Sequence, residues 1–361
     1  ELNISELHLD GLAVGIMRDR HGGVKTQIGS MPQEIGDIAK PSDLKLQFDR
    51  VFQLPFLESF KTLIVQNVTI DYSDGRSLRR LIVDGGRLRV FKRENQLSIR
   101  SDLALLTGGA GVSIIEANYR GEFGKKKADF GLKFSDLPAD IIATQSSGFA
   151  WLAAFDAPLS GALRGTLDEN GTLGPLKSTL DFSGGVLRPG SGSKALQFSS
   201  VKTYFTYNPF LQTLEFDNIS LKSKDLSFSA HGHAFAETDY KGKSSLIGQF
   251  KVNDILASPT ALFEKAKKID LATLNFRLFL DPFEIQIERV HIFDKTHKLD
   301  ARGAARLAIE NSGWAISMEA EIEGLNHGSL LYYWPKTFRP NERDWLENNL
   351  ASANLSNIFF N

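Results

Sequence analysis

Apolar and polar residues alternate along most of this chain with a period of two. In one stretch, Val68, Ile70 and Tyr72 are separated by polar residues. Such alternation is typical of β-strands that have one dry and one wet face. The pattern recurs at Leu97/Ile99, Phe130/Leu132/Phe134, Val201/Thr203/Phe205/Tyr207, Leu214/Phe216, Leu226/Phe228/Ala230, Leu274/Phe276/Leu278/Leu280 and Trp314/Ile316/Met318/Ala320. The sequence therefore predicts many amphipathic strands.

Turn signals separate these apolar runs. They occur at Asp84-Gly85-Gly86, Asn170-Gly171, Gly184-Gly185 and Asn311-Ser312-Gly313. Their spacing suits successive antiparallel hairpins, which predicts a long meander.

Helical patterns are confined to three places, at about 137–154, 254–268 and 327–350. Each follows a similar lead-in, in which an alternating strand runs into Asp or Gly and then an apolar residue. We interpret this as a degenerate internal repeat in which several strands end in one helix. The alternative is that β proteins reuse strand-to-helix turns by chance.

The repeat interpretation predicts four parts. Residues 1–136 form an N-terminal β segment, and 137–253 form a β repeat opened by a helix. Residues 254–326 form a further repeat opened by a helix, and 327–361 form a C-terminal helix that leads into the next, truncated repeat.

Composition excludes several classes of function. The 361 residues are 42% hydrophobic and carry 42 Lys+Arg against 43 Asp+Glu, so the chain lacks the positive field that nucleic-acid binding needs. The absence of cysteine excludes disulfides, Cys-ligated zinc and thiol catalysis, and it fits an oxidising compartment.

The longest apolar run, 149–155, is too short to span a bilayer. Because the sequence opens without methionine and stops inside an expected strand, we expect it to be part of a longer protein.

Candidate reactive residues fit structural roles better. His231 and His233 share one face of a strand without a third ligand at zinc spacing, so we expect a solvent-facing pair. Asp168 and Glu169 lie in an expected hairpin turn, where acidic residues have backbone roles, and this outweighs a glycosidase pair. Lys125-Lys126-Lys127 marks an expected hairpin tip, with a lipid-headgroup contact as the alternative. The sequence thus predicts a protein that is not an enzyme and that uses no cofactor or metal.

The apolar faces of so many strands must be shielded from water. Two sheets can pair, a barrel can close, or the face can bind something foreign. The chain has 26 Phe against 7 Tyr and 4 Trp. A Phe- and Leu-rich surface makes no hydrogen-bond demands and suits acyl chains, although an ordinary core also favours Phe.

Two segments, about 137–190 and 320–355, resemble a known family. The first runs from Leu137-Pro138 through "FDAPLSGALRGTLDENGTLGPLKSTLDFSGG", and the second contains Trp334-Pro335 and Arg343-Asp344-Trp345. These segments are similar to the AsmA-like family of bacterial envelope proteins, in its YhdP-like branch. Elsewhere the resemblance rests only on the alternating apolar pattern of successive strands.

The resemblance implies a mainly β fold, with a long curved antiparallel β-sheet that forms an open hydrophobic groove and a few short helices. It implies a periplasmic segment of a protein tethered to the inner membrane by an N-terminal helix that this chain lacks. The expected function is to bind phospholipid acyl chains and to conduct lipid between inner and outer membrane. The expected partners are phospholipids, both membranes and outer-membrane or periplasmic proteins.

The physics of lipid transfer agrees with this role. Exposing about 30 methylenes to water costs on the order of 20 kcal/mol, at roughly 0.8 kcal/mol each. A continuous apolar surface removes most of that cost, and transport along it needs similar affinity at every step. The competing hypothesis is a scaffold that lends its β-edge to outer-membrane proteins by strand addition and carries no lipid.

We expect the groove to be lined by alternate apolar residues, with a face that flips wherever a bulge occurs. The expected lining residues are Leu97, Ile99, Phe130, Leu132, Phe134, Leu163, Leu180, Phe182, Phe205, Leu226, Phe228, Leu274, Phe276, Leu278 and Ile316.

Overall fold

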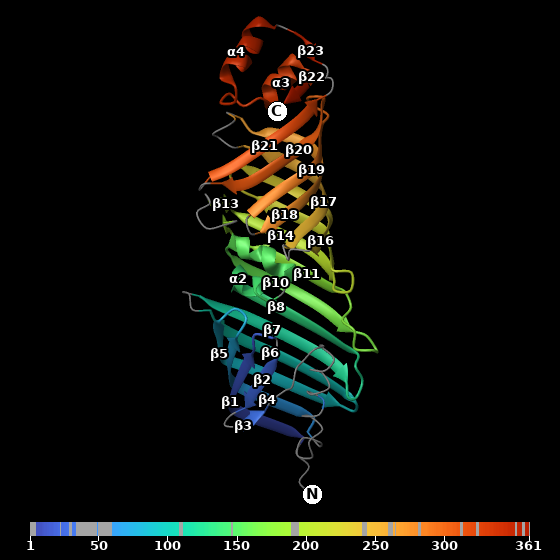
Figure 1. Ribbon diagram of the computed structural model, residues 1–361. Coiled ribbons are helices and arrows are strands. Elements are labelled where there is room, and N and C mark those ends of the chain that lie inside the picture. Colours follow the sequence, from blue (N-terminus) through green and yellow to red (C-terminus); the bar gives the residue numbers. More distant parts are fainter. Residues whose placement is uncertain are drawn as a thin grey trace. The chain divides into compact units, whose positions relative to one another are not determined.

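The structure is a computed structural model, and its strands and helices are labelled in Figure 1. The chain forms two compact units. Unit 1 comprises Glu1–Pro138, Pro158–Thr179 and Tyr207–Leu211, and unit 2 comprises Ala139–Ala157, Leu180–Thr206 and Gln212–Asn361. The structure describes residues 5–21, 23–28, 31–33, 49, 60–107, 111–145, 147–188, 195–239, 244–258, 263, 265–280, 283–310, 313–322, 325–350, 352–355 and 358–360.

Among the described residues, nine strands lie wholly within unit 1. They are β1 (Glu6–Arg18), β2 (Val24–Ile28), β3 (Met31–Gln33), β4 (Thr62–Asp74), β5 (Arg79–Arg93), β6 (Gln96–Leu106), β7 (Val112–Glu122), β8 (Ala128–Pro138) and β10 (Pro158–Leu167). They pair side by side in the order β3–β2–β1–β4–β5–β6–β7–β8–β10. Two further strands, β11 (Leu176–Phe182) and β14 (Ser200–Asn208), contain residues of both units.

The main sheet of unit 2 is a meander in which each strand pairs antiparallel with the next. Its strands are β15 (Thr213–Lys222), β16 (Leu226–Thr238), β17 (Ser244–Ala257), β18 (Lys267–Leu280), β19 (Phe283–Asp294), β20 (Leu299–Glu310), β21 (Gly313–Ile322) and β24 (Ile358–Phe360). Short strands form two small sheets, β9 (Phe155–Asp156) with β12 (Gly185–Leu187) and β13 (Leu196–Phe198), and β22 (Leu325–Asn326) with β23 (Asn354–Leu355). The helices are α2 (Ala139–Ala143), the 3₁₀ helix η2 (Ser147–Ala154), α3 (His327–Tyr333) and α4 (Pro340–Asn349).

The expected fold class is confirmed. The chain is mainly β, the strands of each unit form an open sheet that is not closed into a barrel, and the helices of the described residues are few and short. One pairing departs from the expected antiparallel arrangement, because β1 runs parallel to β4 from Glu6 opposite Thr62 to Arg18 opposite Asp74. Parallel neighbours need a long crossover, and the chain between β1 and β4 is long enough to provide one.

The expected turns differ in outcome. Gly184-Gly185 does not form a hairpin, because it joins β11 to β12, which belongs to a different sheet, and Asn311 and Ser312 lie outside the described residues. At the β10 hairpin, Oδ1 of Asp168 accepts hydrogen bonds from the backbone N–H groups of Asn170 and Thr172, each at 2.8 Å, and Gly171 has φ +79°. Gly85, in contrast, lies inside β5 with φ +77°, where the register to β6 shifts. The predicted turn at Asp84-Gly85-Gly86 was therefore wrong, because a left-handed glycine can build a bulge as well as a turn.

Two of the three expected helices are present. The region 137–154 contains α2 and η2, and 327–350 contains α3 and α4. The helix expected at 254–268 is wrong at both ends, since β17 continues to Ala257 and β18 begins at Lys267. Cross-strand pairing of these ends outweighs their helical pattern, while 259–262 and 264 lie outside the described residues.

Each unit has its own apolar clusters. In unit 1, a cluster of buried residues on β4 to β6 includes Val65, Val90 and Leu97. Unit 2 has a cluster around Ala230, Val252 and Ala272, and a second one in which α3 takes part. These clusters mark the face of each sheet from which water is excluded.

Candidate acyl-chain-binding surface

The strand register assigns the apolar residues of unit 1 to one face of its sheet. Residues directly opposite each other in neighbouring strands share a face. Val90 lies opposite Ile99, Ile99 opposite Tyr119, and Tyr119 opposite Phe130. Leu132 lies opposite Leu163. We call this side the apolar face of unit 1.

All six of the expected lining residues in this part of the chain lie on that face, namely Leu97, Ile99, Phe130, Leu132, Phe134 and Leu163. Leu97 and Phe134 are buried, at 1% and 5% exposure, whereas the other four are half-buried. The half-buried members retain surface that a ligand can cover.

The register of unit 2 defines a second apolar face. Val252 lies opposite Ala272, which lies opposite Ile292, which lies opposite Ala301. Further along the same strands, Leu278 lies between a leucine of β17 and an isoleucine of β19. We call this side the apolar face of unit 2.

Four phenylalanines form a row across this face, which we call the phenylalanine ladder. Phe205, Phe216, Phe250 and Phe276 follow one another with ring centroids 5.5 Å apart at every step. Such spacing is favourable for aromatic pairs. Phe205 and Phe216 are buried, at 2% and 8% exposure, whereas Phe250 and Phe276 are half-buried. The two half-buried rings give the face a surface without hydrogen-bonding groups.

Glycines in neighbouring strands make room for the ladder. Gly232 lies between Phe216 and Phe250 in the register, and Gly248 lies opposite Phe276. A Cβ atom on Gly248 would lie 2.6 Å from the Phe276 ring. Each ring thus covers the strand beside it, and this covering protects a glycine that has no side chain of its own.

The apolar cluster on this face is made by one sheet alone. Around buried Ala230, Val252 and Ala272, every partly buried member of the cluster comes from β15 to β19. Phe228 and Leu274 are among those members and are only half-buried. A closed sandwich would bury such central side chains against a second layer.

The other expected lining residues of unit 2 differ in their surroundings. Phe228, Leu274, Phe276 and Leu278 are half-buried on the apolar face, and Leu226 is 37% exposed on β16. The backbone of Ile316 lies opposite Leu307 on β20, while its side chain lies outside the described residues.

Leu180 and Phe182 lie in a packed part of unit 2. The ring of Phe182 is 4.6 Å from that of Phe155 and 6.4 Å from that of Phe198, and its side chain has no exposed surface. Trp151 of η2 also contacts Phe155, edge to face, at 5.9 Å between ring centroids. Phe182 therefore has no area free for a ligand in this structure, and we leave it out of the proposed surface.

The opposite faces of the sheets are polar. His231 and His233 are both exposed, so the predicted solvent-facing pair is confirmed. On the polar face of unit 1, Nζ of Lys133 lies 2.7 Å from Oε1 of Glu116 on the next strand. Exposed pairs of this kind contribute little to stability, but they keep this face wetted.

The expected hairpin tips are also confirmed. Lys125 and Lys127 lie between β7 and β8, and each forms an exposed ion pair, with Glu122 and Glu169 respectively. Glu169 itself lies in the hairpin turn that follows β10.

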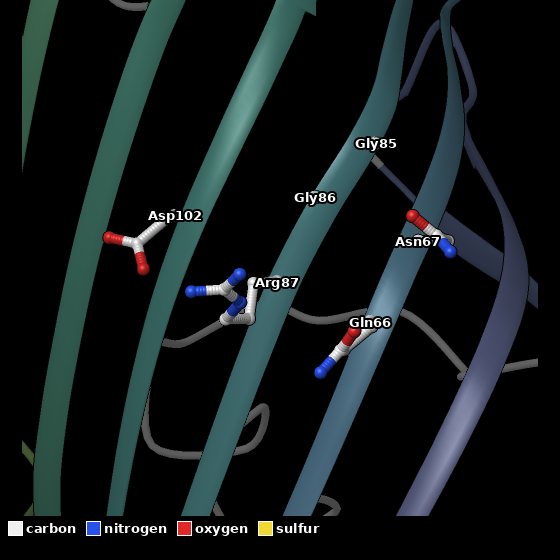
Figure 2. A pocket seen from close by; sticks show the side chains of 6 residues that line it. All are labelled: Gln66, Asn67, Gly85, Gly86, Arg87 and Asp102. Atoms are coloured by element: carbon white, nitrogen blue, oxygen red, sulfur yellow. The ribbon is translucent and has the colours of Figure 1, made fainter.

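A hollow of about 410 Å³ lies on the polar face of unit 1, where β4 and β5 both carry bulges. Figure 2 shows its lining residues on β4, β5 and β6, which are Gln66, Asn67, Gly85, Gly86, Arg87 and Asp102. Its side chains are amides and charged groups, so it is unsuited to an acyl chain.

The side chain of Tyr119 packs against the apolar cluster of unit 1. Burial, together with the charge of Asp49, raises the pKa of Tyr119 above its usual value. Its hydroxyl is buried and has no hydrogen-bond partner among the described residues.

In the part of the chain that the structure describes, no group of three or more His, Asp or Glu side chains could hold a metal ion.

Sequence reasoning missed several members of the two apolar faces. In unit 1 these include Val65 and Val90, and in unit 2 they include Phe250 and Ile292. The signal was present for Phe250, since Gly248, Phe250 and Val252 alternate with polar residues. It was overlooked because that stretch was interpreted as the lead-in to a helix.

Comparisons with protein-family models, with curated proteins and with solved structures find no match for this chain. Among the described residues, no helix combines the length and apolar character needed to cross a membrane.

Proposed function

We propose that this chain binds the acyl chains of phospholipids along the apolar faces of its sheets. The proposal extends to a periplasmic segment of an inner-membrane-tethered protein that conducts lipid between inner and outer membrane. The observation that carries it is the cluster around Val252 and Ala272, which one sheet forms alone and which leaves Phe228 and Leu274 half-buried.

The chemistry of this face fits hydrocarbon. Each methylene that leaves water for an apolar surface gains about 0.8 kcal/mol, so even a chain in partial contact gains several kcal/mol. The phenylalanine ladder offers no donor or acceptor, so it cannot select a headgroup. We therefore expect binding to follow acyl-chain length more than headgroup chemistry.

The phenylalanine ladder runs across neighbouring strands, and this arrangement suits the transfer of lipid along the sheet. Its four rings follow one another across neighbouring strands at equal steps of 5.5 Å. Phe250 and Phe276 keep surface that an acyl chain can contact, and an open surface of this kind would release a chain that a deep pocket would retain. The resemblance of 137–190 and 320–355 to the AsmA-like family supports the same function and the periplasmic location.

Native mass spectrometry of the chain purified from cells without detergent tests this proposal. We expect bound species with the masses of intact glycerophospholipids, and we expect solvent extraction to recover them. A lipid-free protein that instead captures unfolded outer-membrane strands would contradict lipid binding and would support the scaffold function.

A further inference from the structure

Helix α3 lies on the apolar face of unit 2. Leu330 of α3 is 4% exposed and packs in a cluster with Ala301, Ile292 and Ile322. In the strand register these three sheet residues lie in one row with Ala272. The helix therefore covers the same side of the sheet that carries the phenylalanine ladder.

The uncovered and covered parts of this face are continuous. Ile292 packs both against the single-sheet cluster around Ala272 and against the cluster that contains Leu330. An apolar surface that is open on β15 to β18 thus continues beneath α3 on β19 to β21.

Polar and aromatic contacts hold α3 at the rim of this surface. The hydroxyl of Tyr333 donates to the buried carboxylate of Asp294, whose Oδ2 also lies 2.8 Å from Nδ1 of His297. The ring of Tyr332 stacks on His297 at 3.9 Å, and Nζ of Lys267 lies 3.7 Å from the centroid of the Tyr332 ring. Burial acts to raise the pKa of Asp294, but the hydrogen bonds from Tyr333, His297 and Thr296 outweigh it and lower that pKa.

The segment that carries α3 and α4 is closed on itself. Its two ends pair through β22 and β23, where Leu325 lies opposite Leu355. Nε2 of His327 lies 3.0 Å from the carbonyl oxygen of Leu346, which joins α3 to α4. We call residues 325–355 the helical cover, since these contacts join its parts to one another.

We propose that the helical cover occupies an acyl-chain site on β19 to β21 and is displaced when a chain enters. This inference rests on the proposed function. Leu330 and its neighbours then take the place of hydrocarbon, and the Tyr333–Asp294 hydrogen bond holds the cover closed.

A closed cover lowers the apparent affinity for lipid. A ligand that needs the open state binds with its intrinsic affinity multiplied by the open fraction. A weakened Tyr333–Asp294 contact should therefore tighten lipid binding, whereas the loss of a lining residue would weaken it. This opposite sign separates a cover from an ordinary structural contact.

The test compares Tyr333→Phe with Tyr332→Phe in the full chain. Tyr332→Phe is the matched control, because its hydroxyl makes no hydrogen bond to the described residues while its ring contacts are kept. The probe is phosphatidylethanolamine with a fluorescent acyl chain. We expect Tyr333→Phe to lower its Kd by up to about tenfold, the effect of one charge-assisted hydrogen bond, and Tyr332→Phe to leave it unchanged.

Equal Kd values for the wild type and both variants would overturn the cover and leave lipid binding intact. Absence of binding in all three would overturn the proposed function, and this inference with it.

A second measurement follows the cover itself. The natural chain has no cysteine, so Leu330→Cys introduces a single thiol beneath α3 and Trp345→Cys introduces one on the exposed side of α4. We expect saturating probe to raise the rate of maleimide labelling at position 330 several-fold and to leave position 345 unchanged. An unchanged rate at position 330 in a protein that binds the probe would contradict displacement.

Discussion

A phenylalanine ring can lie across a neighbouring strand only where that strand leaves it room. Phe250 reaches Phe216 over Gly232, and Phe276 lies over Gly248. In unit 1 the ring of Phe130 lies over Gly165, where a Cβ atom would come within 2.5 Å of it. At the scale of single residues, these glycines are as much a part of the apolar faces as the rings.

Substitution of Gly232 tests this arrangement. A Cβ atom there would lie 2.1 Å from the carbonyl oxygen of Gln249, so the strands must separate. We expect Gly232→Ala to cost about 1–3 kcal/mol of unfolding free energy, the range for overpacking. Gly111→Ala is the control, because its Cβ would meet nothing within 4 Å. The midpoint of urea unfolding measures both, and equal midpoints would contradict the close packing at Gly232.

At the scale of elements, alternation along the chain was sufficient to predict the strands. A period of two is a local property, and it located β4, β6, β8, β16 and β18 with the side that faces the core. The hydrogen-bonding partners of a strand are not local. For that reason the parallel pairing of β1 with β4, which joins distant segments, was not predicted.

Bulges and covering elements also escaped prediction. Gly85 in β5 and Asp254 in β17 adopt positive φ inside strands, at +77° and +53°, where the sequence indicated a turn and a helix. The burial of Phe182 depends on rings from other segments, Phe155 and Phe198. Alternation identifies the dry side of a strand but not what lies on it, so the candidate surface was only partly predictable.

Strand β18 permits a direct test of face assignment. Leu278 lies on the apolar face and Asn275 on the polar face of the same strand. We expect Leu278→Asp to weaken binding of a fluorescent phospholipid by about tenfold or more, because the chain would have to desolvate a carboxylate. Asn275→Asp adds the same charge on the other side and should leave binding unchanged, with urea midpoints to verify folding. Equal losses in both variants would show that the apolar side has no special role.

At the scale of the whole molecule, both units repeat the same division between an apolar and a polar face. The chain carries nearly equal numbers of basic and acidic residues, so long-range attraction to a charged partner is weak. The balanced charge and the two Phe- and Leu-rich faces favour a ligand that is recognised by its hydrocarbon. We therefore expect acyl chains to contact these faces.

Photocrosslinking can locate bound acyl chains on the protein. The reagent is a phospholipid with a diazirine in its acyl chain, and the modified residues are identified by mass spectrometry of the digested protein. We expect adducts at residues of the apolar faces, such as Phe130, Phe228 and Leu274, and none at His231 or Arg87 on the polar faces. Adducts spread equally over both faces, or gathered in the polar hollow beside Arg87, would contradict this expectation.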